Sequence, residues 1–220
     1  MSGWSAPTAL LPVSARYAGG LWLLGSVQFI LLGLALTLAA YPGHSILNGH
    51  ISDLGSSHSP FALFFNRSIE LLGVMGALGV LLVRGALAPG RASRLGLGLL
   101  FLASAAAVAV GLFPEDFPGA GPTIHALASA SVFVGAALAL LLVSRAIRHD
   151  RRWAGLPSPT ALTGVVMLLA TGVYVVGFTP YVGSGGMESL IVAPLLLWLL
   201  GVGSRLARTP PFAPRPLLST

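Results

Sequence analysis

Six long apolar segments alternate with short polar connections along this chain of 220 residues. Each segment has roughly the 20 apolar residues that a helix needs to cross the hydrocarbon core of a bilayer. The segments are residues 19–40, 61–83, 94–113, 124–143, 161–178 and 187–202, the last of which is short and contains Pro194. The pattern therefore predicts an all-α, polytopic membrane protein with six transmembrane helices.

Composition agrees with this prediction and leaves room for one domain. Hydrophobic residues make up 55% of the chain and charged residues 8%, whereas about a quarter of the residues of a soluble protein are charged. We expect an N-terminal tail at residues 1–18, a transmembrane domain at residues 19–205 and a proline-rich C-terminal tail at residues 206–220. Because the chain has no cysteine, disulfides and thiolate chemistry are excluded.

The basic residues fix the predicted orientation. All 12 are arginine, and eleven of them precede the first segment, follow the sixth, or connect the second to the third and the fourth to the fifth: Arg16, Arg84, Arg91, Arg94, Arg145, Arg148, Arg151, Arg152, Arg205, Arg208 and Arg215. Arginine concentrates in short cytoplasmic loops, so we expect cytoplasmic termini and three outward-facing hairpins in the cell membrane. Because the arginines sit at membrane exits without interleaved aromatics, the net charge of +6 does not indicate nucleic-acid binding.

Most acidic residues and histidines belong to the opposite, outward side: Asp53, Glu70, Glu115, Asp116, Glu188, His44, His50, His58 and His125. The connection at residues 41–60 is the most informative, since it contains Ile51-Ser52-Asp53-Leu54-Gly55 together with three of these histidines. The separation of arginines from acids and histidines thus predicts the topology, and it indicates the side of the membrane on which chemistry is expected.

The second segment carries polar residues at membrane depth. Asn66, Glu70 and Gly73 follow one another at spacings of four and three and share a helix face. Arg67, the one arginine outside the pattern, is three residues from Glu70 and can pair with it. Ionisable groups at this depth usually face a bundle interior or a watery cavity. The alternative is structural, with a self-neutralising pair and Asn66 bonded to a neighbouring helix.

A polar constellation is expected where the outward loops meet. His125 opens the fourth helix, and His50, Asp53, Asp116 and Glu188 belong to the same rim. Such a group offers acid and base pairs, or oxygen and nitrogen ligands. No spacing matches the histidine–glutamate–histidine helix of a zinc protease, so the sequence predicts no metal and leaves any cofactor unassigned.

Helix ends and helix contacts also leave sequence signals. Pro42, Pro114 and Pro180 each predict the end of an outgoing helix, and Ser59 followed by a proline predicts a capped start for the second helix. The glycines are scattered through helices rather than gathered in a phosphate-binding loop. We therefore expect close helix packing at Gly76, Gly79, Gly96, Gly98, Gly164 and Gly172.

The chain resembles the six-helix membrane family known as domain of unknown function 998. The resemblance rests on Ile51-Ser52-Asp53-Leu54-Gly55, Asn66, Gly73, Gly111-Leu112-Phe113-Pro114, His125 and Gly186-Met187-Glu188. More distantly, the loop, Asn66 and His125 are similar to the damage-regulated autophagy modulator and Sfk family, which includes proteins implicated in remodelling glycosylphosphatidylinositol lipid. The resemblance implies six helices and an outward polar site. It departs at Ser189, where the family pattern tends to have arginine.

Three functions remain open. The first is a lipid-binding protein or lipid-directed hydrolase or transferase, with His125 as general base oriented by Asp53 or Glu188, and helix starts that receive a phosphate or oxyanion. Substrate contacts are expected from Ser52, Asn66, Arg67, Glu70, His50 and Asp116. The second is a noncatalytic subunit or assembly factor bound to other membrane proteins. The third is a small-solute transporter, for which the third and fifth helices supply few polar groups.

Overall fold

The computed structural model describes residues 11–179 and 181–208, and over these ranges it contains helices and no strands. Six helical runs are long and apolar enough to cross a bilayer, which confirms the predicted fold class. The first run is α1 (Val13–Gln28), the π-helical η1 (Phe29–Leu36) and α2 (Thr37–Ala39), and the fourth is α5 (Gly121–Ala130), the π-helical η4 (Ser131–Gly135) and α6 (Ala136–Ile147). The others are α3 (Ala62–Val83) with the 3-10 turn η3 (Arg84–Ala86), α4 (Arg91–Leu112), α7 (Pro157–Val175) and α8 (Gly183–Ala207).

Several helices are longer than their apolar segments. The first begins at Val13 rather than residue 19, and α8 runs from Gly183 to Ala207 rather than over residues 187–202. The ends of a helix are set by its backbone hydrogen bonds rather than by the polarity of its side chains. These helices therefore extend past their apolar stretches. Pro194 lies inside α8 without ending it, as membrane helices tolerate.

The predicted helix signals had mixed outcomes. The helices before Pro42 and Pro114 end at Ala39 and Leu112, as expected, whereas Pro180 lies outside the described residues. The prediction that Ser59 caps the second span is wrong. The helix α3 begins at Ala62, after a turn in which the Ala62 N–H donates to the Ser59 carbonyl. The Ser59 hydroxyl is buried without a partner among the described residues.

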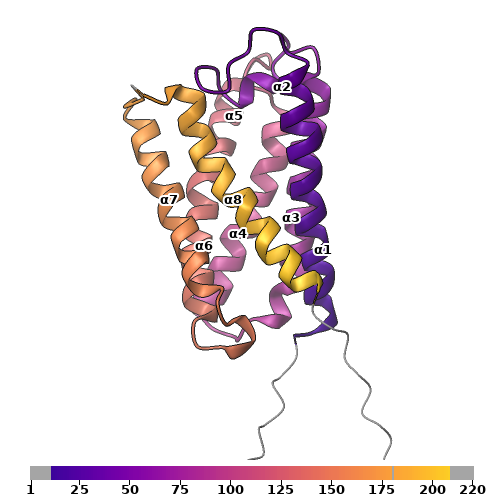
Figure 1. The fold of residues 1–220 in the computed structure, drawn as a ribbon, viewed down its shortest axis with the longest axis vertical. Helices are drawn as coiled ribbons and strands as arrows, with labels where there is room; N and C mark the ends of the chain where they lie inside the picture. Colours follow the sequence, from indigo (N-terminus) through magenta and orange to yellow (C-terminus); the bar gives the residue numbers. More distant parts are fainter. Residues whose placement is uncertain (1–10, 180, 209–220) are drawn as a thin grey trace, which may run out of the picture.

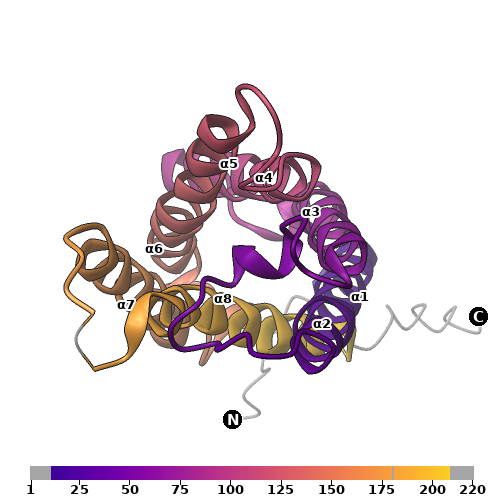
Figure 2. The ribbon, with the colours of Figure 1, turned by 90° about the horizontal axis from the view of Figure 1, so that it is seen from above.

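The six spans stand side by side along the bundle (Figure 1). Each span packs against the next in the chain, and α8 packs against α1, so the spans form a closed ring, which is seen from above in Figure 2. In this view the connection between α2 and α3 lies across the middle of the ring. This connection contains the 3-10 turn η2 (Ser52–Gly55). We call this end of the bundle, with residues 40–61, 113–120, 176–179 and 181–182, the polar-loop end.

Glycines bring neighbouring spans into close contact. A Cβ added at Gly111 of α4 would lie 2.5 Å from the Asn66 carbonyl oxygen of α3. The predictions of close packing at Gly76, Gly79, Gly96 and Gly164 are confirmed, since an added Cβ would collide with another span at three of them and would lie 3.1 Å from the fourth span at Gly96. The predictions at Gly98 and Gly172 are wrong, because nothing lies within 4 Å of an added Cβ. Periodicity alone does not tell which glycines face a neighbour.

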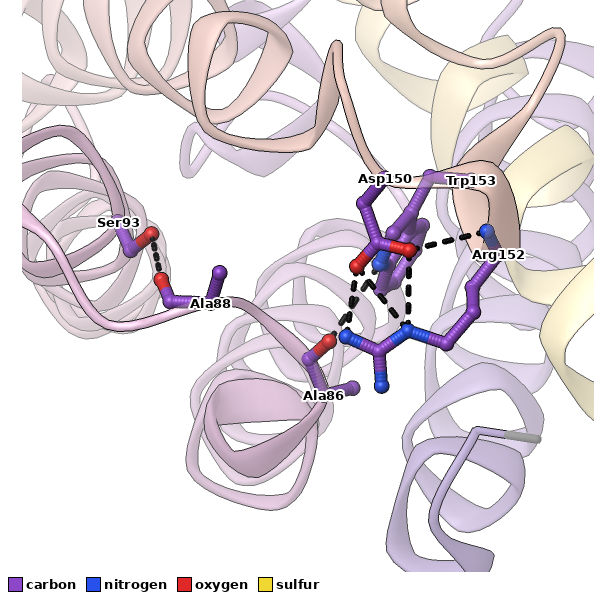
Figure 3. A network of polar contacts seen from close by, with 6 residues as sticks. All are labelled: Ala86, Ala88, Ser93, Asp150, Arg152 and Trp153. Carbon is purple, nitrogen blue, oxygen red and sulfur yellow. Dashed lines mark hydrogen bonds and ion pairs between the residues drawn. The ribbon is translucent and has the colours of Figure 1, made fainter. Parts of the chain in front are cut away.

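The opposite end, which we call the arginine end, contains residues 11–16, 84–94, 145–156 and 204–208, and it combines a local ion pair with a contact between two loops (Figure 3). The Asp150 carboxylate accepts hydrogen bonds from the backbone and guanidinium of Arg152, two residues away, with a closest distance of 2.6 Å. The Trp153 indole N–H donates to the Ala86 carbonyl over 3.4 Å and ties this loop to the connection between α3 and α4. The Ser93 hydroxyl, in the first turn of α4, donates to the Ala88 carbonyl in the connection before that helix.

Candidate functional site at the polar-loop end

The loop over the ring is pinned to two helices. At the start of α8, the Gly186 N–H donates to the Leu47 carbonyl over 3.0 Å and the Ser184 hydroxyl donates to the Asn48 carbonyl over 2.8 Å. On α3, the Asn66 amide donates to the Gly55 carbonyl over 2.9 Å. These bonds hold the loop backbone down on the bundle and place η2 above the ring interior.

Two glycines make the α8 contact possible. A Cβ at Gly183, whose φ is +67°, would collide with the Leu47 carbonyl, and one at Gly185 would collide with the Gly49 carbonyl. The loop backbone therefore lies directly on the backbone of the first helical turn. Larger residues at either position would push the loop away from α8.

Glu188 joins the loop to the bundle interior. Its side chain is buried and accepts the Ile51 N–H over 2.6 Å. The same carboxylate oxygen lies 3.7 Å from His50 Nδ1, which also lies 2.9 Å from the Tyr174 hydroxyl of α7. Hydrogen bonding to Glu188 and the charge of that carboxylate raise the pKa of the His50 imidazole, against the opposing effect of burial. His50 thus bridges α7 and α8.

A pair of carboxyl groups lies beside this bridge. Asp53 accepts the His50 N–H over 2.8 Å, and Glu115, from the connection between α4 and α5, accepts the Ser52 hydroxyl over 2.8 Å. Burial, and then a hydrogen bond with the Asp53 carboxyl, raise the pKa of Glu115 from 4.5 to about 7, although the Ser52 hydroxyl opposes the rise. Two carboxyl groups that interact in this way favour sharing one proton, and the raised pKa of Glu115 keeps this proton bound up to near-neutral pH.

An apolar cavity of about 100 Å³ lies inside the ring beneath this group. All six spans line it, and its polar lining is restricted to Ser52, Ser104, His125, Ser129 and Glu188. An apolar cavity of about 150 Å³ is sufficient to bind benzene, so this one has room for several carbon atoms. We call the cavity, together with His50, Ser52, Asp53, Glu115, Tyr174 and Glu188, the capped chamber.

Both π-helical segments contribute to the chamber. Phe29 of η1 and Phe133 of η4 line the cavity from the first and fourth spans, which are separated by two spans on either side of the ring. Segments of π-helix inside α-helices are rare and frequently occur at functional sites. Their position supports the chamber as the functional region.

The structure brings together some of the residues expected at the site. His50, Ser52, Asp53 and Glu188 meet in one cluster. His125 lines the cavity, but the predicted orientation by Asp53 or Glu188 is wrong. Its Nδ1 lies 2.9 Å from the Phe113 carbonyl, one of the carbonyls that a helix end leaves without an intrahelical donor. A carbonyl only accepts, so Nδ1 carries a proton there and Nε2 is the acceptor of the neutral ring.

The remaining expected residues lie outside the cluster. Asp116 accepts the Ser57 N–H at the surface over 2.7 Å, and hydrogen bonds from Ser57 lower the Asp116 pKa. Asn66 anchors the loop. Arg67 and Glu70 form the predicted pair, with atoms 2.5 Å apart, and the Arg67 side chain is 62% exposed. Arg67 lies on the outer face of α3 and Glu70 packs at the contact with α4, so neither side chain lines the cavity.

Sequence reasoning missed Glu115 and Tyr174. Glu115 was visible as one of the outward acids, next to Pro114, but nothing in its spacing connects it with Ser52, 63 residues earlier. Tyr174 gives no sequence signal beyond an aromatic near a membrane boundary. Within the described part of the chain, no group of three or more histidine, aspartate or glutamate side chains is arranged to hold a metal ion.

Comparison with known proteins identifies a family. The family described as "Protein of unknown function (DUF998)" matches residues 14–205, which include all six spans but for their outermost residues at the two ends of the chain, and the whole chamber. No curated protein and no solved structure matches the chain. The wider resemblance to the damage-regulated autophagy modulator and Sfk family stays a prediction. The chain belongs to the DUF998 family of proteins.

Proposed function

We propose that this protein is a hydrolase or transferase that acts on an uncharged lipid ester at the outer face of the cell membrane. The observation that carries the proposal is the 2.8 Å hydrogen bond from Ser52 to Glu115 at the mouth of an apolar cavity. A hydroxyl bonded to a carboxylate offers a nucleophile beside a general base. The arginine distribution favours an outward position for this end.

The charge of the chamber favours an uncharged substrate group. Asp53, Glu115 and Glu188 are acidic, and a phosphate among them would be repelled. The start of α8 is already occupied, because the Gly186 N–H donates to the loop. We therefore assign the chamber to an acyl ester and the first carbons of its hydrocarbon chain rather than to a lipid phosphate.

The proposed reaction begins when Glu115, in its ionised form, accepts the Ser52 hydroxyl proton. Ser52 Oγ then bonds to the ester carbonyl carbon, and the bond to the leaving alcohol breaks as Glu115 returns the proton to that alcohol. Water or a second alcohol next attacks the acyl-serine, gives its proton to Glu115 and releases the acyl group from Ser52, which recovers its proton. A base whose pKa is about 7 suits this exchange at neutral pH.

The other polar groups have supporting roles in this proposal. Asp53 raises the proton affinity of Glu115, and Glu188 holds the Ile51 N–H so that the next residue, Ser52, is directed at the cavity. His125 lines the cavity with Nδ1 fixed by a carbonyl, so its other nitrogen is directed to the substrate as a proton acceptor, or as a second base.

The test uses the purified protein in nanodiscs with fluorescent diacylglycerol and phosphatidylethanolamine esters, with and without an acceptor alcohol. We expect acyl release or transfer from diacylglycerol and much less from phosphatidylethanolamine, whose phosphate the acidic groups repel, and a loss of at least about 100-fold in Ser52→Ala and Glu115→Gln. Asp150→Asn, at the arginine end, is the matched carboxyl control and is expected to keep the activity. Size-exclusion profiles establish that each variant is folded.

A separate binding measurement tests the cavity. Ala107 lines it, and Ala107→Leu fills much of its volume, so a photoreactive acyl ester is expected to label this variant less than the unchanged protein. Unchanged labelling, or equal activity in Ser52→Ala and the unchanged protein, would contradict the proposal. Recovery of a stable stoichiometric partner without any acyl chemistry would favour a noncatalytic subunit, and accumulation of a solute in proteoliposomes would favour transport.

A further inference from the structure

A second, separate recess lies on the lipid-facing surface between the first span and α3. It encloses about 280 Å³ and is lined by Gln28, Leu32, Leu63, Phe64, Arg67, Ser68 and Leu71. The apolar side chains are exposed, from 43% for Leu71 to 64% for Leu63. In a membrane protein such a face meets hydrocarbon, so the recess has the shape and surface of a seat for an acyl chain.

Arg67 places a cation at this recess, on the half of the protein that otherwise lacks arginine. It lies five residues after the start of α3, which corresponds to roughly 7–8 Å along the helix and to headgroup depth. Its Nη1 donates to Glu70, and within the described residues no other acceptor is bonded to the guanidinium. The remaining N–H groups form a planar donor set, which suits a phosphate.

The polar neighbours of Arg67 do not compete for a headgroup. The Gln28 amide donates to the Ser68 carbonyl over 2.8 Å and to the Gly25 carbonyl over 3.0 Å, so it ties α1 to α3. Glu70 is only 15% exposed and packs beside Gly111 on the α4 side. It holds the guanidinium while the exposed part of Arg67 stays available.

We propose that this recess binds a glycerophospholipid of the outer leaflet, with its phosphodiester on Arg67 and one acyl chain between Leu32 and Leu71. Binding requires the phosphate, because the remaining N–H groups of Arg67 need an acceptor. Because Glu70 balances the charge of Arg67, the seat is neutral as a whole, and it therefore discriminates little between anionic and zwitterionic headgroups. The seat is independent of the capped chamber and of any reaction there.

The experiment uses the full-length protein in detergent with lipids that carry a diazirine in one acyl chain. Phosphatidylglycerol and phosphatidylethanolamine are compared with a galactosyl diacylglycerol, which has no phosphate. We expect both phospholipids to label peptides containing residues 28–32 and 63–71, and Arg67→Gln to lower this labelling about tenfold. Labelling by the galactolipid should be weak and unchanged by the substitution.

Matched variants separate the seat from general attraction to arginine. Arg91→Gln removes an exposed cation at the arginine end and is expected to leave labelling of residues 63–71 unchanged. Arg67→Lys keeps the charge without the planar donor set and is expected to give intermediate labelling. Leu32→Trp fills the recess and should lower labelling by both phospholipids.

Two results would overturn this proposal. One is equal labelling of residues 63–71 in Arg67→Gln and the unchanged protein, or equal labelling by the galactolipid. The other is a crosslink from residue 32 or 71 to a second copy of the chain or to another protein helix, with lipid excluded. Neither result bears on the ester chemistry at Ser52, which is measured separately.

Discussion

The two ends of the bundle use their ionisable residues in opposite ways. At the polar-loop end, side chains far apart in sequence meet, since Ser52 bonds Glu115 and His50 lies between Tyr174 and Glu188. At the arginine end the ion pair is local, since Asp150 pairs with Arg152 two residues away (Figure 3), while the Arg205 guanidinium donates to the backbone carbonyl of Ala154, 51 residues away. The cluster at the polar-loop end requires the whole ring to be folded, whereas the Asp150–Arg152 pair forms within one short loop.

This difference separates topology from candidate function. A local ion pair in a partly exposed loop adds little to stability, and the positive-inside distribution needs no such pair. A part-buried network drawn from two connections and two helices is costly unless it is complete. Its presence above an apolar cavity makes the polar-loop end the region where chemistry is expected.

The largest expected effect comes from separating the loop from α8. In Gly185→Ala, the added Cβ collides with the Gly49 carbonyl, so we expect a loss of about 1–3 kcal/mol in the free energy of unfolding. Thermal unfolding in detergent, followed by tryptophan fluorescence, measures it. Gly98→Ala is the control, because the added Cβ has open space and alanine favours the helix. Equal midpoints for the two variants would contradict the assigned loop contact.

Removing one carboxylate at each end compares the networks directly. Glu188→Ala leaves the buried Ile51 N–H without its acceptor, so we expect a cost of about 1–3 kcal/mol, partly recovered in Glu188→Gln. Asp150→Ala removes the acceptor of a local pair and should cost less than about 1 kcal/mol. Unfolding midpoints of the three variants test this order, and a larger loss in Asp150→Ala would reverse the comparison.

The pH dependence of stability should fall mainly on the polar-loop end. Because folding raises the pKa of Glu115 from 4.5 to about 7, the folded protein binds more protons in this window and the free energy of unfolding falls as the pH rises through it. The raised pKa of His50 acts in the same direction, since its contribution is lost as the pH rises through that pKa.

Glu115→Gln is expected to flatten this decline. After allowance for solvent screening, the difference corresponds to roughly 2–4 °C in the unfolding midpoint between pH 4.5 and 7. Asp150→Asn should leave the slope over this range unchanged, because the Arg152 hydrogen bond lowers the pKa of Asp150 and moves its titration below the window. An identical slope in Glu115→Gln and the unchanged protein would exclude a raised Glu115 pKa.

The smallest effect is expected for the coupling within the arginine-end pair. A double-mutant cycle of Asp150→Ala and Arg152→Gln should give about 0.2–1 kcal/mol, and less at high salt. The corresponding cycle of Ser52→Ala and Glu115→Gln should give a larger coupling that salt hardly changes, because burial dominates at Glu115, where it raises the pKa, whereas the Arg152 hydrogen bond dominates at Asp150. A stronger and salt-resistant coupling at Asp150 would remove the distinction between the ends.

The fold was more predictable than the site. Apolar length and arginine placement are local properties, so they identified six spans and the end of the bundle that carries the acids and histidines, without any knowledge of contacts. The same reasoning assigned His125 to a carboxylate, although its partner is the Phe113 carbonyl, 12 residues away. It also treated Gly98 and Gly76 alike, although only Gly76 faces a neighbouring span.

By itself, the sequence determined which segments enter the membrane and which connections carry the acids and histidines, because burial in hydrocarbon acts on each segment separately. Only the tertiary structure decided that α8 closes the ring by packing against α1 and that Glu115 meets Ser52. It also decided that the Arg67 side chain is exposed on the outside of the bundle. Those contacts depend on how the spans pack against one another and on the conformation of one loop. No periodic pattern in the sequence predicts either of them.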